Sequence, residues 1–182
     1  MLETALNGSQ CLVSAVPHLK KLFVPKVFYP LVSVGTDSIN FVFSVSGLLV
    51  LALVVGFQLK LSLAALPAAI AIVAAYNLGM VLVYGVGTVH FRDLPHILQV
   101  MYPAFFYAVP IFYPMSAIAP QYHWVFLLNP FYWFINLFRR IIHDGSYPSF
   151  SESCIPSVLA ILALLAGFSL LLAKDRTLIY RL

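Results

Sequence analysis

The sequence predicts an all-α protein that crosses a membrane several times. Of its 182 residues, 62% are hydrophobic and only 9% are charged, whereas an average soluble domain has about 25% charged residues. Several uncharged stretches are long enough for a membrane-spanning helix, which needs about 20 apolar residues. Their side chains do not alternate between apolar and polar as those of a membrane β-barrel do. These observations exclude a soluble enzyme, a disordered tail and a nucleic-acid-binding domain.

The expected spans lie between charged residues. The uncharged stretch 94–138 has 45 residues, which is too long for one helix and too short for two helices with a comfortable loop. Its second half is interrupted at Pro120 and Pro130, so it predicts a short re-entrant or interfacial helical hairpin before the last span. We therefore expect four membrane-spanning helices, near residues 38–57, 63–88, 96–115 and 154–173.

The positions of Lys and Arg predict that both ends of the chain are cytoplasmic, because cytoplasmic loops carry more of these residues than loops on the other side. With four spans, one side holds seven basic residues and the other holds three. The seven are Lys20, Lys21, Lys26, Arg92, Lys174, Arg176 and Arg181, and the three are Lys60, Arg139 and Arg140. The first sixteen residues lack a basic start, so they are not a secretory signal peptide.

A basic and apolar segment, residues 17–30, precedes the first expected span. Its mixture of Lys and large apolar side chains suits a short helix on the cytoplasmic face of the membrane, with a length limited by Pro25 and Pro30. One interpretation is a plain interfacial anchor. The other is a docking element that receives force from a soluble partner.

The loop between the second and third expected spans contains Arg92 and Asp93. The pair either ends the span at the water boundary or braces a cytoplasmic gate. One carboxylate and two histidines, without a second acid or a ligand set, define no reaction. Cys11 and Cys154 have no CxxC spacing or His-rich neighbourhood, so we expect no metal site, disulfide framework or cofactor.

Aromatic residues concentrate in residues 102–134, which hold 13 of the 27 aromatic side chains in the chain. An interfacial belt needs only a few Trp and Tyr at each boundary. Because aromatic faces are apolar platforms and Tyr and Trp also carry polar atoms, the alternative interpretation is a path for a long amphipathic chain such as a sugar polymer.

The expected spans contain no charged residue, so ion-coupled transport is not expected. Their amides, Asn40, Asn77 and Gln99, need only hydrogen-bond partners. Small residues spaced by four, Ala71, Ala75 and Gly79, predict the close approach of a neighbouring helix. No GxxxxGK[ST] motif occurs, so any ATP hydrolysis through that device belongs to another chain.

Four short motifs and one basic residue, in order along the chain, resemble the ABC-2 type permeases that export polysaccharides such as O-antigen, capsule or teichoic acid. They are Lys20-Lys21 followed by Val24-Pro25, His90-Phe91-Arg92-Asp93-Leu94, Val109-Pro110-Ile111-Phe112-Tyr113-Pro114, Leu128-Asn129-Pro130, and Arg139. The resemblance implies one membrane domain over residues 1–182. Its expected parts are the end of a preceding span and a cytoplasmic coupling segment (1–36), three spans (37–115), an extracytoplasmic hairpin (116–147), the last span (153–173) and a cytoplasmic tail (174–182).

The resemblance implies a permease subunit, not an enzyme, in a bacterial exporter of lipid-linked polysaccharide. The transporter would contain two permease copies in the cytoplasmic (inner) membrane and two copies of a separate ATP-binding subunit. The residues implied for ATPase docking are Lys20, Lys21, Val24, Pro25 and Lys26. Arg92 and Asp93 are the candidate gate residues. The residues implied for the glycan path are Tyr102, Phe106, Tyr113, Trp124 and Tyr132.

The family normally has two spans before the basic segment and six in all, so the resemblance implies that this sequence begins near the end of the second. One alternative is an ABC-2 exporter of drugs or small hydrophobic molecules. The other is a membrane-embedded glycosyl- or acyltransferase, which would need carboxylates or a histidine facing a water-filled cavity. The six acidic residues are expected outside the spans or at their edges.

Overall fold

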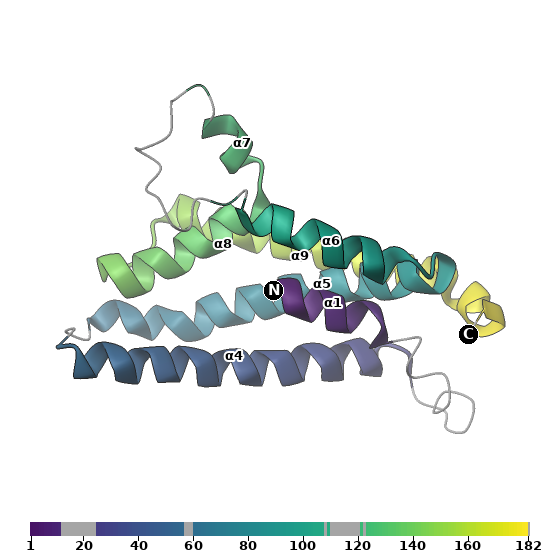
Figure 1. The fold of residues 1–182 in the computed structure, drawn as a ribbon, viewed down its shortest axis with the longest axis horizontal. Helices are drawn as coiled ribbons and strands as arrows, with labels where there is room; N and C mark the ends of the chain where they lie inside the picture. The colour runs from purple at the N-terminus through teal and green to yellow at the C-terminus, as the bar shows by residue number, and fades with distance from the viewer. Residues whose placement is uncertain (12–24, 57–59, 108, 110–120, 122, 182) are drawn as a thin grey trace.

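In the computed structural model the chain is a bundle of helices (Figure 1). The structure describes residues 1–11, 25–56, 60–107, 109, 121 and 123–181, and the account below concerns these residues. The elements are the α-helices α1 (Leu2–Ser9), α4 (Phe28–Val54), α5 (Leu66–His90), α6 (Leu94–Tyr107), α7 (His123–Leu127), α8 (Pro130–Arg139) and α9 (Phe150–Arg181), the 3-10 helix η1 (Leu61–Ala65) and the π-helix η4 (Arg140–Asp144).

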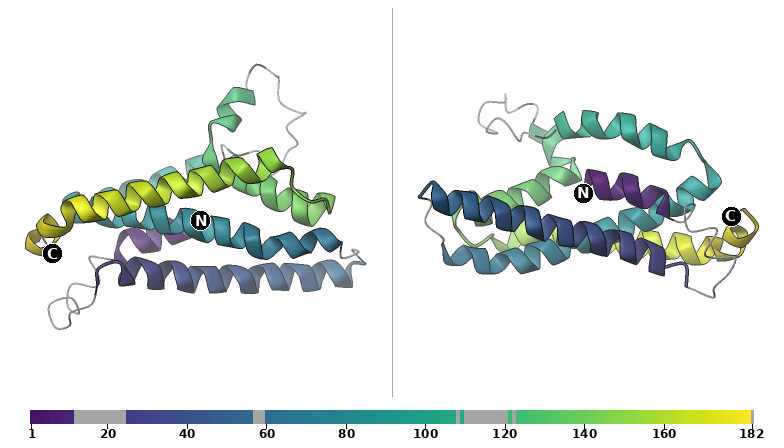
Figure 2. Two further views of the ribbon diagram at one scale, coloured as in Figure 1. Left: turned by 180° about the vertical axis from the view of Figure 1, so that it is seen from behind. Right: turned by 60° about the horizontal axis from the view of Figure 1, so that its bottom comes forward.

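Three helical segments are long and apolar enough to cross a membrane. They are Phe28–Val54, Leu61–His90 and Phe150–Lys174, and they contain the expected spans 38–57 (to Val54), 63–88 and 154–173. The three lie side by side along the long axis of the molecule (Figures 1 and 2). The predicted all-α, multipass membrane fold is therefore confirmed.

The third expected span, 96–115, is only partly described. Helix α6 covers 14 residues, which corresponds to about 21 Å, less than the ~30 Å of a hydrocarbon core. Residues 108 and 110–120 lie outside the described part of the chain. A complete span at this position therefore stays a prediction.

Helix α4 begins at Phe28, ten residues before the expected start of the first span. The expectation that Pro30 ends the preceding basic segment was wrong, because Pro30 lies in the first turn of α4. A proline is tolerated there, since the first backbone N–H groups of a helix have no partner within it. As a consequence Asp37 lies well inside the helix α4, as its tenth residue.

Helix α5 is the centre of the bundle. Gly79 on α5 leaves no room for a Cβ atom, which would overlap the backbone of Ala163 and Leu164 on α9. A Cβ on Gly167 would lie 2.6 Å from the carbonyl oxygen of Gly79. The two helices therefore pack backbone against backbone, as the small residue Gly79 predicts, whereas Ala71 of the same predicted stripe is exposed.

The remaining helices pack around this pair. The short helix α1 contacts α4, α5 and α6, and Figure 2 shows it between α4 and α6. Helix α8 precedes α9 and packs on the bundle through Phe134 and Leu137, which are both buried. With α7 and η4, it lies within the predicted hairpin range, 116–147. The π-helix η4 ends at Gly145, whose positive φ of 61° favours glycine.

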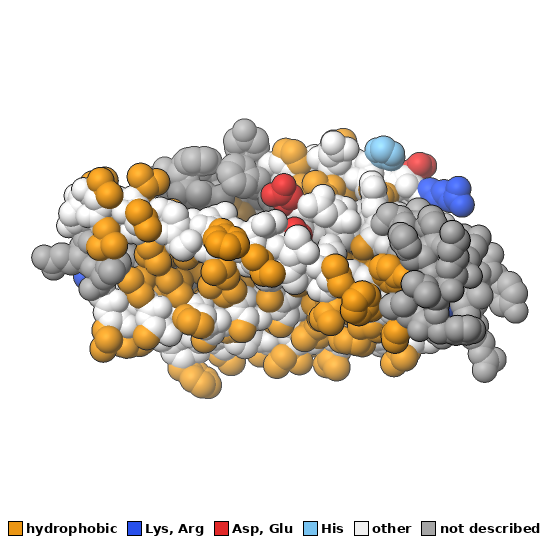
Figure 3. Space-filling view, turned by 90° about the horizontal axis from the view of Figure 1, so that it is seen from below, with side chains coloured by type: hydrophobic (Ala, Val, Ile, Leu, Met, Phe, Trp, Pro, Cys, Tyr) orange, Lys and Arg blue, Asp and Glu red, His pale blue; other side chains and the backbone are white. Residues whose placement is uncertain are grey.

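The outer surface of the bundle is largely apolar, as the membrane interpretation requires. Phe43 on α4, Val55 just after its end and Leu172 on α9 are 71%, 84% and 75% exposed. Hydrophobic side chains cover much of the face in Figure 3, with a few acidic atoms near its middle. Exposed apolar side chains at this density are suited to lipid or to a second protein surface.

Candidate functional site

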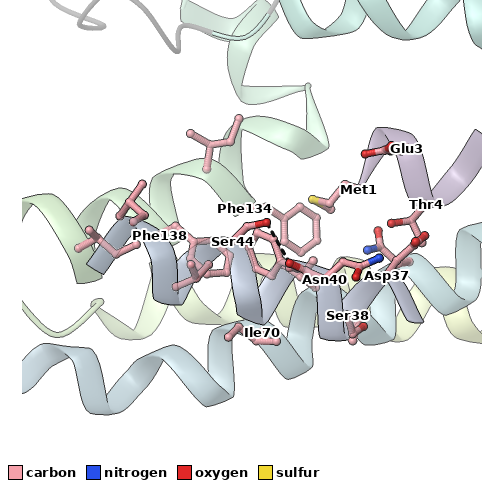
Figure 4. A pocket seen from close by; sticks show the side chains of 18 of the residues that line it. Met1, Glu3, Thr4, Asp37, Ser38, Asn40, Ser44, Ile70, Phe134 and Phe138 are labelled. Atoms are coloured by element: carbon pink, nitrogen blue, oxygen red, sulfur yellow. Dashed lines mark hydrogen bonds between the residues drawn. The ribbon is translucent and has the colours of Figure 1, made fainter. Parts of the chain in front are cut away.

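A cavity of about 780 Å³ lies between α1, α4, α5 and α8, and its lining extends into η4 (Figure 4). Ligand sites in proteins typically have volumes of about 300–1,000 Å³. The cavity contains polar residues near the middle of two membrane-spanning helices. Asp37 is the tenth residue of α4, roughly 14 Å from its start, and Asn77 is the twelfth residue of α5.

The polar side of the cavity is formed mainly by one face of α4. Asp37, Asn40 and Ser44 recur at intervals of three and four residues, so they project from the same side of the helix. The Ser44 hydroxyl donates to the backbone carbonyl of Asn40 over 2.9 Å, as Figure 4 shows. Thr4 of α1 and the buried Asn77 of α5 also line the cavity.

Asp37 carries the one carboxylate oxygen in the described part of the chain that is buried without a hydrogen-bond partner. Its Oδ2 atom accepts no hydrogen bond from any described residue. A buried polar atom costs free energy unless it is hydrogen-bonded, and carboxylates inside membrane spans usually mark functional positions. Because α4 begins ten residues before the expected span, Asp37 lies within this helix, and the expectation that the acidic residues lie outside the spans or at their edges stays a prediction.

The opposite side of the cavity is aromatic. Phe134 of α8 is 1% exposed and its ring packs at 4.7 Å from that of Tyr76, centroid to centroid. Phe138, one helical turn later, meets Phe41 of α4 edge to face at 5.5 Å. The cavity is thus polar on α4 and aromatic on α8, and Glu3, Arg139 and His143 also line it.

Ion pairs hold the hairpin to the start of α9. Arg140 donates from Nε to Glu152 at 2.8 Å and from Nη1 to Asp144 at 3.3 Å. The hydrogen bond to Glu152 raises the pKa of Arg140 above its ordinary value. A raised pKa of a base adds stability below the ordinary value, and this stability is lost only as the pH rises through the folded-state value, far above the physiological range.

The predicted docking residues lie mostly outside the described chain. Lys20, Lys21 and Val24 fall in residues 12–24, about which the structure gives no description. Pro25 is exposed and Lys26 is half-buried, and both directly precede α4. Their role in docking stays a prediction.

The predicted gate residues Arg92 and Asp93 are both exposed in the turn between α5 and α6. Over the residues that the structure describes, their side chains form no ion pair with each other. The Asp93 carbonyl accepts a hydrogen bond from the Ile97 amide at 3.1 Å, which belongs to the first turn of α6. Their role in a gate stays a prediction.

The structure does not gather the predicted glycan-path residues in the cavity. Tyr102 is 5% exposed and packs with Ala5 and Leu98. Trp124 is 61% exposed on α7, and Tyr132 on α8 is half-buried against Trp133. Tyr113 and the side chain of Phe106 lie outside the described part.

Sequence reasoning missed Asp37 as a site residue and treated Asn40 and Asn77 as ordinary amides. A signal was present, because Asp37, Asn40 and Ser44 share one face of any helix that includes all three. The predicted span began at residue 38 and left Asp37 out, whereas α4 begins at Phe28 and includes all three residues. In the described residues, no group of three His, Cys, Asp or Glu is arranged to hold a metal ion.

The helices and the apolar surface define a multipass membrane protein. A comparison with protein families matches residues 18–143 to the ABC-2 type transporter model. The chain belongs to the ABC-2 type transporter family, and the predicted resemblance is confirmed.

The curated relatives of the chain are named as permeases, which agrees with the family match. The chain is 25% identical over 166 residues, 90% of its length, to an O-antigen export system permease protein RfbA of Myxococcus xanthus. It is 23% identical over 144 residues, 79% of its length, to a protein of the same name from Klebsiella pneumoniae. The matches cover 64% and 56% of these two relatives, so the chain spans less than two thirds of their length.

Proposed function

We propose that this chain is the permease subunit of an ATP-binding-cassette exporter that moves lipid-linked polysaccharide across the bacterial inner membrane. The observation that carries the proposal is the ABC-2 match over residues 18–143, found in a chain whose curated relatives are named O-antigen export permeases. The three apolar helices long enough to cross a membrane agree with such a role.

The mechanism is mechanical. Two ATP-binding subunits close on ATP and push on the segment 17–30, with Lys20, Lys21, Val24, Pro25 and Lys26 as the contact residues. Because Lys26 lies two residues before α4, the push reaches a membrane-spanning helix without an intervening domain. Tilting of the spans opens a path for the glycan, and Arg92 and Asp93 brace its cytoplasmic end. No covalent chemistry on the substrate is required.

The assembly contains two copies of the permease, with both termini of each in the cytoplasm. A second copy would cover part of the exposed apolar surface described above, and lipid would cover the rest. Tyr102, Phe106, Tyr113, Trp124 and Tyr132 remain the proposed aromatic lining of the export path.

Co-purification tests the proposal. The chain is tagged after Leu182, expressed in its native host and extracted in mild detergent, and a stoichiometric ATP-binding subunit is expected in the eluate. Substituting Lys20, Lys21 and Lys26 by Ala should remove that subunit while membrane insertion stays intact. The matched control is a triple Ala variant of Lys174, Arg176 and Arg181, which removes the same charge from the predicted cytoplasmic tail and should retain it.

An unchanged yield of the ATP-binding subunit with the Lys20/Lys21/Lys26 variant would contradict the docking assignment. Deletion of the chain separates the substrate classes. Loss of surface glycan supports polysaccharide export, whereas normal surface glycan with increased sensitivity to small hydrophobic compounds supports an exporter of such compounds. If the purified chain transfers a glycosyl or acyl group without any ATP-binding subunit, and Asp93→Asn abolishes that transfer, a membrane-embedded transferase is favoured.

A further inference from the structure

We propose that Lys60, Ser62 and Tyr147 are positioning residues that hold the hairpin in a fixed place on α5 and α9 while glycan is exported. The role in export rests on the proposed function. The three residues lie at the end of the bundle where α8 ends and α5 begins (Figure 1), and none of them lines the cavity. The last residues of the hairpin, 140–147, are called the hairpin end below.

Two side chains that precede α5 bind backbone carbonyls of the hairpin end. The Lys60 ammonium donates to the carbonyl of Asp144 at 3.0 Å, and the Ser62 hydroxyl donates to that of Ile141 at 2.9 Å. The last carbonyls of a helix have no partner within the helix, and a cation near them is favourable. Donors from a distant part of the chain therefore cap η4.

The Lys60 side chain also lies directly over Gly145. A Cβ atom at position 145 would overlap the Lys60 side chain, so this arrangement requires glycine. A further bond is donated in the opposite direction, from the Tyr147 hydroxyl to the carbonyl of Leu61 at 3.2 Å. Each of the two segments thus donates to a backbone oxygen of the other, which fixes the position of both main chains.

Buried apolar side chains join the same two parts of the molecule. Leu66 and Ala69 of α5 form one cluster with Leu137 of α8 and Ile141 of η4. Ile141 belongs to this cluster through its side chain and accepts the Ser62 bond through its carbonyl. Displacement of the hairpin end would therefore expose apolar surface and break a buried hydrogen bond together.

The hairpin end is also connected to α9. Arg140 pairs with Glu152 in the first turn of α9 at 2.8 Å. An exposed ion pair contributes little stability by itself, so the contacts with α5 carry more of the attachment. Because α5 and α9 touch backbone to backbone at Gly79, the two supports form one unit. Segments that open as lids have few buried contacts, unlike the hairpin end.

Spin labels test whether the hairpin is fixed. Cys11 and Cys154 are replaced by Ser, and the labels are attached through Leu128→Cys before α8 and Leu172→Cys on α9, at positions that are 73% and 75% exposed. One narrow distance distribution is expected for the chain alone. It should stay the same in the complex with the ATP-binding subunit when ATP is added. A distance that shifts with ATP would show that the hairpin moves and would overturn the inference.

The variant Lys60→Met/Tyr147→Phe tests the bonds, and it should still fold because both side chains are exposed. The distance distribution should widen, and the amides of residues 141–147 should exchange hydrogen at least about tenfold faster, because two hydrogen bonds are lost. Lys60→Arg keeps a cationic donor and is the matched control, with the distribution and exchange of the wild type. A double variant that matches the wild type in both measurements would contradict the assignment.

Export distinguishes a positioning role from a purely structural one. The Lys60→Met/Tyr147→Phe chain should co-purify with the ATP-binding subunit and support normal ATP hydrolysis, while less glycan reaches the cell surface per ATP hydrolysed. Lys60→Arg should export normally. If the double variant widens the distance distribution but exports glycan as the wild type does, the hairpin position does not matter for export and the inference is wrong.

The outcomes separate this inference from the proposed function. If the ATP-binding subunit co-purifies and export requires the chain, but the variants change neither the hairpin nor export, the inference is wrong and the proposed function stands. If co-purification and export both fail, the proposed function falls and the role in export falls with it. The label distances and hydrogen exchange of the chain alone then still decide whether the three residues fix the hairpin.

Discussion

Ser62 donates its hydroxyl hydrogen to the backbone carbonyl of Ile141 over 2.9 Å, although the two residues are 79 positions apart. Both are buried, with 2% and 1% of their surface exposed. Close by, the Lys60 ammonium donates to the carbonyl of Asp144 at 3.0 Å. The connection between α4 and α5 is therefore held directly against the π-helix that ends the hairpin.

Replacing Ser62 by Ala should destabilise the protein by about 1–3 kcal/mol, because the buried Ile141 carbonyl loses this donor. Equilibrium unfolding of the purified protein in mixed detergent micelles would measure the change. Ser169→Ala is the control, because the exposed Ser169 bonds only to the carbonyl of Ala166 on its own helix. Equal effects of the two substitutions would show that the Ser62 bond contributes nothing specific.

The contact between α5 and α9 predicts that replacement by Ala lowers stability at Gly79 but not at Gly47. Gly79→Ala places a methyl group into the backbone of Ala163 and should cost about 1–3 kcal/mol of stability, the usual range for overpacking. At Gly47 on α4 an added Cβ meets nothing within 4 Å, so Gly47→Ala should cause no loss. Thermal denaturation in detergent, followed by loss of the monodisperse peak, compares them. A stable Gly79→Ala protein would contradict the close packing.

Ser149 and Glu152 form a reciprocal cap at the start of α9. The Ser149 amide donates to Glu152 Oε2 at 2.8 Å, and the Glu152 amide donates to Ser149 Oγ at 3.4 Å. Loss of such a cap costs about 1 kcal/mol. We expect Glu152→Ala to lower the free energy of unfolding more than Glu152→Gln, because Gln keeps an acceptor for the Ser149 amide.

Salt separates the two roles of Glu152, which also pairs with Arg140. Screening weakens an exposed ion pair but leaves a short hydrogen bond within a helix cap largely intact. The difference in stability between the wild-type protein and Glu152→Gln should therefore shrink in high salt, while the deficit of Glu152→Ala should persist. If the stability losses of Glu152→Gln and Glu152→Ala both disappeared in high salt, the whole effect of Glu152 would come from its ion pair with Arg140.

Asn129 caps α8 through its side-chain oxygen, which accepts from the Phe131 amide at 3.0 Å. Asn129→Ala should cost about 1 kcal/mol, and Asn129→Asp should retain most of the stability because a carboxylate also caps a helix start. Hydrogen exchange of the α8 amides measures the effect locally. Faster exchange in both variants would mean that the amide side chain has a further role beyond capping.

The sequence predicted the long helices because their apolar runs are long and bounded by charges. Two prolines that were predicted to interrupt helices, Pro30 and Pro130, both lie at the start of a helix. Asn129-Pro130 was expected to interrupt a run, and the structure shows it as the cap and first residue of α8. Pro30 was expected to end a helix, but it lies in the first turn of α4. A proline interrupts a helix interior and is tolerated in a first turn, so the residue alone does not distinguish the end of one helix from the start of the next.

The candidate site was less predictable than the fold. Its polar residues come from α1, α4, α5, α8 and η4, and its phenylalanines come from α4 and α8. Periodicity shows which residues share one helix face, but the packing of different helices decides which faces meet. The aromatic density of residues 102–134 indicated a path, whereas Tyr102 is buried against Ala5 and Trp124 is exposed on α7.

The glycine contact between α5 and α9 has a consequence for movement. Two helices that touch at the backbone have no side-chain layer in which small sliding could be absorbed, so they move as one rigid body. Helix α8 packs on this body through Phe134 and follows it. Helix α4 lies outside this body, with an exposed outer face, and borders the cavity, so we expect it to be the long helix that moves. A rotation of α4 alone would change the width of the cavity while the other long helices stay in place.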